Sequence, residues 1–175
     1  MVGINFHPLI VHFPVALLTV YCLFEIIRFR RLLTSQTFFY TKATFAILGS
    51  ISLLPTYLSG EIIEREFEDV HRIVEVHSAF AKSAIGIFGI IAFFYLVELV
   101  GKNQVTIDML RSKVPFVLKI TKMVDVIIFR KHIIAVLAVI GFFIMMMLGA
   151  LGGIIAHGQD IDPFTSIVYK LFFGN

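Results

Sequence analysis

The chain lacks most of the features that mark a soluble enzyme. It has 175 residues and a single cysteine, Cys22, so no intramolecular disulfide can form. It contains no recognisable nucleophile, acid–base pair or phosphate-binding loop, and this excludes a conventional catalytic motif. It also has no internal repeat, no low-complexity tract and no soluble second domain. We therefore expect one domain over residues 1–175, and only a redox subunit stays open as an enzymatic role.

No basic residue precedes the first apolar run, and no small-x-small cleavage site follows it. This pattern favours a retained membrane span over a cleaved signal peptide. Apolar residues make up 58% of the chain, and the mean hydropathy is +0.93, far above the soluble average. The bilayer is therefore the expected solvent, and the net charge of +3 is explained by membrane topology without a nucleic-acid partner.

Four apolar stretches are long enough to cross a hydrocarbon core, which takes about 20 helical residues. They cover about residues 6–27, 43–60, 78–100 and 132–156. We therefore expect an all-α fold, an integral membrane four-helix bundle that is multi-pass in a bacterial inner membrane.

The charges predict which way the bundle faces. Eleven of the 15 basic residues flank or fill the first and third connections, so the positive-inside rule makes both connections cytoplasmic. Both termini and the loop from Glu61 to His77 are then extracytoplasmic. The cytoplasmic segment 103–130 mixes apolar and basic residues and reads as an amphipathic helix on the inner leaflet. The tail Pro163–Phe173 is too short to span and is expected at the outer interface.

The first span carries unusual residues for a lipid anchor. His7 and His12 are polar, and Pro14 lies inside the helix, where it removes the hydrogen bond that the Ile10 carbonyl would accept. Pro8 fits the first helical turn, where a missing N–H costs nothing. Pro55 interrupts the second span in the same way, with Tyr57 and Ser59 beside it. These features predict a ligand pocket at the outer end of the bundle.

Five of the six histidines fall on the predicted outer side. His12, His77 and His157 come to similar depth there. Helical spacing places small residues beneath each histidine on its own face. These residues are Ala16 below His12, Ala81 and Ala84 below His77, and Gly149 and Gly153 below His157.

A histidine above small residues leaves a flat slot beside its helix, and a macrocycle ligated by that histidine needs such a slot. Small residues also pack helices closely in membranes without any ligand, and that reading stays open. Imidazole suits iron, copper and zinc, and histidine is a standard axial ligand of haem iron. The rival motif Glu68-Asp69-Val70-His71 has Glu-x-x-His spacing, but a di-metal site would want a second copy, which is absent.

Residues 7–18, HPLIVHFPVALL, resemble the opening of an uncharacterised family of small bacterial four-helix predicted membrane proteins. Ser59-Gly60, His77 and Gly152-Gly153 before His157 resemble the same pattern. The resemblance implies a membrane location and a haem or redox association. By motif it carries over to His7, His12, His77 and, more weakly, His157.

The leading hypothesis is therefore a b-type haem protein that transfers electrons near the extracytoplasmic face. In it His12 and His77 ligate the iron across the bundle, and His7 and His157 serve as further ligands. A quinol or an extracytoplasmic electron carrier is the expected partner, and an oligomer is compatible with the sequence. Two alternatives stay open: a transition-metal protein using the same histidines for copper, zinc or non-haem iron, and a cofactor-free structural or assembly subunit. Among the histidines we expect His77 to matter most, and His71 little.

Overall fold

A computed structural model describes residues 7–27, 35–63, 71–102 and 130–174, and these residues form five helices and no strand. The four long helices are α1 (His7–Ile26), α3 (Gln36–Ile63), α4 (His71–Lys102) and α7 (Arg130–His157). A short fifth helix, α8 (Pro163–Phe173), follows α7. The expected all-α fold is therefore confirmed.

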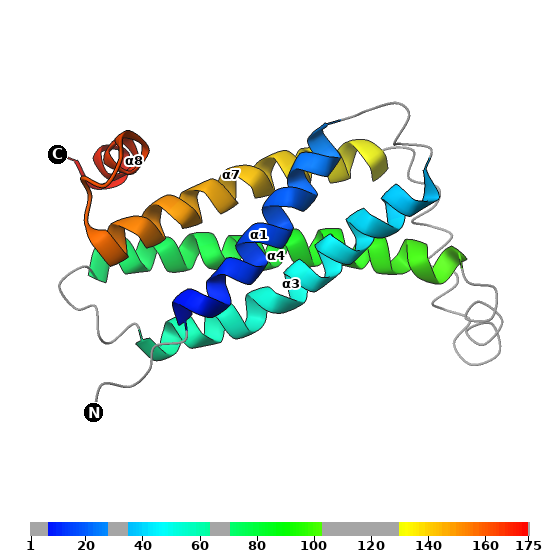
Figure 1. Cartoon of the computed structure of the whole chain (residues 1–175), viewed down its shortest axis with the longest axis horizontal. Coiled ribbons are helices and arrows are strands. Elements are labelled where there is room, and N and C mark those ends of the chain that lie inside the picture. Colours follow the sequence, from blue (N-terminus) through cyan, green and yellow to red (C-terminus); the bar gives the residue numbers. More distant parts are fainter. Residues whose placement is uncertain (1–6, 28–34, 64–70, 103–129, 175) are drawn as a thin grey trace.

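The long helices pack side by side as a four-helix bundle with alternating directions (Figure 1). Helices α1 and α4 each pack against both α3 and α7, so α1 and α4 lie diagonally opposite each other. Helix α8 packs on α7 at the end of the bundle where α1 and α4 begin (Figure 1). We call this end the histidine end, because α1 and α4 bring His7 and His77 to it.

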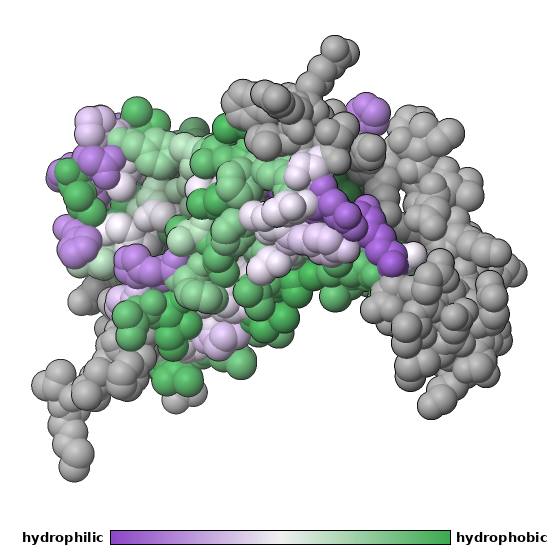
Figure 2. All heavy atoms as spheres, turned by 45° about the vertical axis from the view of Figure 1, so that its right-hand side comes forward, coloured by the Kyte–Doolittle hydropathy of each residue, from purple (hydrophilic) through white to green (hydrophobic). Residues whose placement is uncertain are grey.

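Each long helix is long and apolar enough to cross a membrane. Figure 2 shows apolar side chains over the middle of the bundle and polar ones toward its ends. Each predicted span overlaps one of these helices, but α3 and α4 begin seven residues earlier than the apolar stretches at 43 and 78. Hydropathy detects only the apolar part of a helix, whereas backbone hydrogen bonding continues into the polar residues beside it. Part of the expected Glu61–His77 loop is therefore helical.

Several predictions fall outside the described residues. Residues 103–129 of the expected amphipathic segment are among these, as are Glu64, Glu66, Glu68 and Asp69 of the acidic loop. His71 opens α4, but its side chain is not described.

Prolines and caps set the local form of three helices. Pro8 lies in the first turn of α1, as expected, whereas Pro14 and Pro55 lie inside α1 and α3. Asp162 caps α8, because its side chain accepts hydrogen bonds from the backbone N–H groups of Phe164 and Thr165 at 2.7 and 3.0 Å.

Two glycines allow the helices to approach closely. A Cβ atom added at Gly49 of α3 would lie 2.5 Å from Leu18 Cδ2 of α1. One added at Gly141 of α7 would lie 2.7 Å from Phe88 Cζ of α4. Leu18 and Phe88 are both fully buried. Glycine at these two positions therefore brings large core side chains against a neighbouring backbone, as is common between membrane helices.

Candidate functional site

A cavity of about 470 Å³ lies at the histidine end, between all four long helices. Its wall is mostly apolar and includes three glycines of α7. Its polar lining residues are His7, His12, Thr56, Tyr57, Glu61, His77, Ser78 and His157. A mostly apolar cavity of this size with a few convergent polar groups is typical of a small-molecule or cofactor site. We call it the histidine cavity.

His7 is held by the end of α3. Its Nδ1 atom lies 2.8 Å from Ser59 Oγ, and the Ser59 hydroxyl donates to the Thr56 carbonyl, also at 2.8 Å. The neighbouring Gly60 leaves room for the ring, since a Cβ there would lie 3.2 Å from His7 Cε1. The imidazole of His7 is thus seated between a polar helix end and the cavity.

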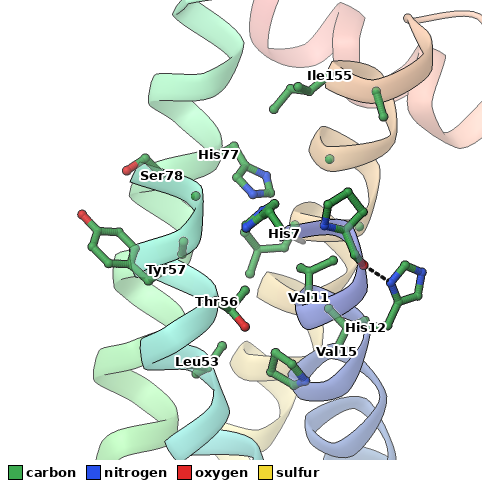
Figure 3. Close-up of a pocket in the computed structure, with 18 of the residues that line it drawn as sticks. His7, Val11, His12, Val15, Leu53, Thr56, Tyr57, His77, Ser78 and Ile155 are labelled. Carbon is green, nitrogen blue, oxygen red and sulfur yellow. Dashed lines mark hydrogen bonds between the residues drawn. The ribbon is translucent and has the colours of Figure 1, made fainter. Parts of the chain in front are cut away.

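His77 enters the cavity from α4. Its Nδ1 atom is buried and has no hydrogen-bond partner within the described residues. Figure 3 shows the rings of His7 and His77 pointing toward each other from their two helices. Because α1 and α4 are diagonal in the bundle, the two imidazoles meet across its centre. A buried ring nitrogen without a partner is costly, so a ligand atom at this point would stabilise the fold.

His12 is among the lining residues of the cavity, but its imidazole ring does not point toward His7 and His77. Its side chain is exposed, and its Nδ1 atom donates to the carbonyl oxygen of Pro8 in the same helix. In Figure 3 its ring points away from His7 and His77. Among the expected ligands, the structure therefore sets His7, and not His12, opposite His77.

The cavity rim carries the remaining polar groups. His157 is exposed at the last residue of α7. The Tyr57 hydroxyl donates to Glu61 Oε1 at 2.5 Å, and Lys82 Nζ lies 6.0 Å from the centre of the Tyr57 ring. These groups lie toward the surface, so the cavity has an apolar interior and a polar, titratable edge.

The small residues expected beneath the histidines divide into two groups. Ala81, Gly149 and Gly153 line the cavity. Ala84 is instead fully buried in the core, and Ala16 is exposed and lies outside the cavity lining. A Cβ added at Gly149 would meet no atom within 4 Å, so no tight helix contact requires glycine at that position. Gly149 is exposed and lines the cavity.

The sequence pointed to Ser59 and Gly60 only through the neighbouring Pro55 and the family resemblance, and it did not single out Thr56, although all three residues lie around His7. Their spacing of three and four residues places Thr56 with Ser59 and with Gly60 on one face of α3. That spacing, next to Pro55, was the available signal. Its link to His7 needed the three-dimensional packing, because 52 residues separate His7 from Ser59.

The cavity brings together the imidazole rings of His7 and His77. Within residues 7–27, 35–63, 71–102 and 130–174, the histidine cavity included, no three His, Cys, Asp or Glu side chains gather in a metal-binding group. Comparison of the chain with protein-family models, with curated proteins and with solved structures finds no match.

Proposed function

We propose that the protein is a membrane-embedded b-type haem protein that carries electrons, and that His7 and His77 hold the haem iron. The observation that carries this proposal is the pair of imidazoles that face each other across a mostly apolar cavity. Haem iron needs only two ligands from the chain, because the porphyrin supplies four nitrogens. Two histidines on facing helices of a bundle match that requirement.

Three separate features of the cavity support binding of a flat apolar macrocycle. The Nδ1 atom of His77, which has no hydrogen-bond partner among the described residues, marks a place where a ligand atom would be stabilising. Gly149, Gly152 and Gly153 of α7 line the cavity without side chains, and a Cβ added at Gly149 would meet open space. The volume of about 470 Å³ lies in the ordinary range for bound cofactors.

Bound haem would supply a centre that gains and loses one electron. The residues of the chain would do the rest. His7 and His77 would fix the position of the group, and the apolar side chains of Val11, Val15 and Leu53 would keep water from it. The polar rim around Tyr57 and Glu61 would face the aqueous side.

The placement in the membrane is part of the proposal. The positive-inside rule puts the first and third connections in the cytoplasm, which sets the histidine end at the extracytoplasmic face of a bacterial plasma membrane. A quinol from the bilayer or an electron carrier from the extracytoplasmic side would then reach the cavity.

The test is expression with a haem precursor, purification in detergent and an absorption spectrum with haem quantified per chain. We expect a Soret band in wild type and in His12→Ala, and its loss in His7→Ala and His77→Ala. His132→Ala is the matched control, because His132 is exposed on α7 far from the cavity. A helical, monodisperse wild type without a Soret band would overturn the proposal.

A transition-metal site is the second candidate, and one observation favours it. His12, His157 and Glu61 also line the cavity and could add ligands to His7 and His77 after side-chain movement. Elemental analysis of the same preparation separates the two functions. Stoichiometric copper or zinc without porphyrin would favour the metal site, whereas iron with porphyrin favours haem. A protein that retains neither would indicate a structural subunit.

A further inference from the structure

We propose that Ser59 is a positioning residue of the histidine cavity, because its hydroxyl fixes His7 in the Nδ1–H tautomer and leaves the lone pair on Nε2. The tautomer is a property of the chain alone. Its use in metal ligation rests on the function proposed above.

A serine hydroxyl has a single proton to donate. Ser59 Oγ lies 2.8 Å from the Thr56 carbonyl oxygen and 2.8 Å from His7 Nδ1. A carbonyl oxygen can only accept, so the contact with Thr56 uses the hydroxyl proton. Ser59 Oγ must then accept at its second contact, and His7 Nδ1 must donate to it.

The direction of this hydrogen bond determines the tautomer of the His7 ring. A neutral imidazole carries one N–H, so donation at Nδ1 leaves Nε2 as the nitrogen with a lone pair. Only a nitrogen with a lone pair can bind iron, zinc or copper.

The local sequence of α3 provides the groups that surround the His7 ring. The Thr56 hydroxyl donates to the Ser52 carbonyl at 2.8 Å, and the Thr56 carbonyl accepts from the Ser59 hydroxyl. Gly60 keeps the ring side open, since a Cβ there would lie only 3.2 Å from His7 Cε1. Ser59 and Gly60 thus have complementary roles, one orienting the ring and the other making room for it.

Groups behind a ligating histidine commonly set its tautomer and orientation, and their loss weakens metal affinity by roughly 10- to 100-fold. We therefore expect Ser59→Ala to weaken haem retention by that factor. Ser59→Thr keeps a hydroxyl at the same position, so this variant should retain most of the haem that wild type retains.

The direct test is nitrogen-15 NMR of histidine-labelled protein in micelles, purified without haem. The His7 signals are assigned by their absence in His7→Gln. We expect wild-type His7 to show a protonated Nδ1 and an unprotonated Nε2. Ser59→Ala should shift the tautomer ratio toward Nε2–H. Ser59→Thr should keep the wild-type ratio.

Ser83→Ala is the matched control. The Ser83 hydroxyl also donates to a helix carbonyl, that of Ala79 at 2.9 Å, but Ser83 is exposed on α4 and does not line the cavity. A merely structural role for Ser59 would change stability without moving the His7 tautomer.

An unprotonated Nδ1 in wild type, or an unchanged tautomer in Ser59→Ala, would overturn the inference. The measurement is made without haem, so its outcome is independent of whether the protein binds one. If the tautomer behaves as expected but no haem binds, the proposed function fails and the role of Ser59 in orienting His7 stands.

Discussion

Glu25 Oε2 lies 2.6 Å from Lys42 Nζ, and this ion pair joins α1 to α3 at the end of the bundle opposite the histidine cavity. Tyr95 of α4 donates to the same oxygen at 3.1 Å, so three helices meet at one carboxylate. The Glu25 side chain is 9% exposed and that of Lys42 is 12% exposed. Charges so well removed from water persist only when paired.

Breaking that pair from one side should destabilise the bundle strongly. Lys42→Met leaves the Glu25 carboxylate buried without its cation, which should cost about 3–5 kcal/mol of unfolding free energy. The double variant Glu25→Gln with Lys42→Met removes both charges and should recover most of the loss. Reversible unfolding in mixed micelles measures both.

Lys102→Met is the comparison for that prediction, because the Lys102–Glu98 pair is far more exposed and joins residues of one helix, and Lys102 also contacts the Phe39 ring of α3. Its effect should stay near 1 kcal/mol. Equal losses of unfolding free energy in Lys42→Met and Lys102→Met would show that the buried Glu25–Lys42 pair stabilises the bundle no more than an exposed pair does.

Filling the cavity from α7 should exclude the cofactor without harming the fold. A Cβ at Gly149 meets no atom within 4 Å, and the residue lines the cavity. Gly149→Val should therefore weaken haem retention by roughly 10- to 100-fold, the equivalent of about 1–3 kcal/mol of overpacking against the ligand. Haem content per chain and thermal stability are measured together.

Gly89→Val is the matched substitution. Gly89 is also an exposed glycine in a long helix with open space around its Cβ position, but it lies outside the cavity lining. Haem retention should be unchanged in this variant. If Gly149→Val retained as much haem as Gly89→Val, the cofactor would not occupy the space beside Gly149.

Adding one methyl group beside His7 should affect haem retention more than adding one beside His77. A Cβ at Gly60 would lie 3.2 Å from His7 Cε1, tighter than most real contacts, whereas a Cβ at Gly152 would lie 3.6 Å from His77 Cε1, an ordinary contact. Gly60→Ala should therefore displace His7 and lower haem retention several-fold, and Gly152→Ala should leave it within about twofold. Ligand titration of the haem-free variants reports the difference, and the reverse order would contradict it.

Removing the cap of α8 should loosen that helix alone. Asp162→Ala deletes the acceptor for two backbone N–H groups and should cost about 0.5–2 kcal/mol. Hydrogen exchange should rise through Pro163–Phe173 and stay unchanged in α1 and α4. Faster exchange spread over all five helices would mean that α8 is integral to the bundle.

The fold could be predicted largely from the sequence, because the membrane imposes one strong rule. A run of apolar residues about 20 long must be helical to satisfy its backbone, so four runs give four helices. Alternating directions then place the first and third helices diagonally, as the structure shows for α1 and α4. The helix ends were less predictable, since Gln36–Lys42 and His71–His77 mix polar and apolar residues and are nevertheless helical.

For the candidate site, the sequence predicted only the end of the bundle at which it lies, and not which side chains meet there. His7, His12, His77 and His157 were expected together, and all four line one cavity. Which side chains meet depends on how far each helix is rotated about its axis, and no sequence pattern gives that rotation. His12 lies five residues from His7, about 140° around the helix, so the two imidazoles point in different directions. The role of Ser59 depends on the contact between α1 and α3, which is likewise tertiary.

The most direct test is near-infrared magnetic circular dichroism of the oxidised, haem-loaded protein, which identifies the pair of axial ligands. We expect a bis-imidazole band in wild type and in His12→Met. In both His7→Met and His77→Met we expect a histidine–methionine band or loss of haem. A bis-imidazole band that persists in either of these last two variants would contradict the assignment of His7 and His77 as the ligands.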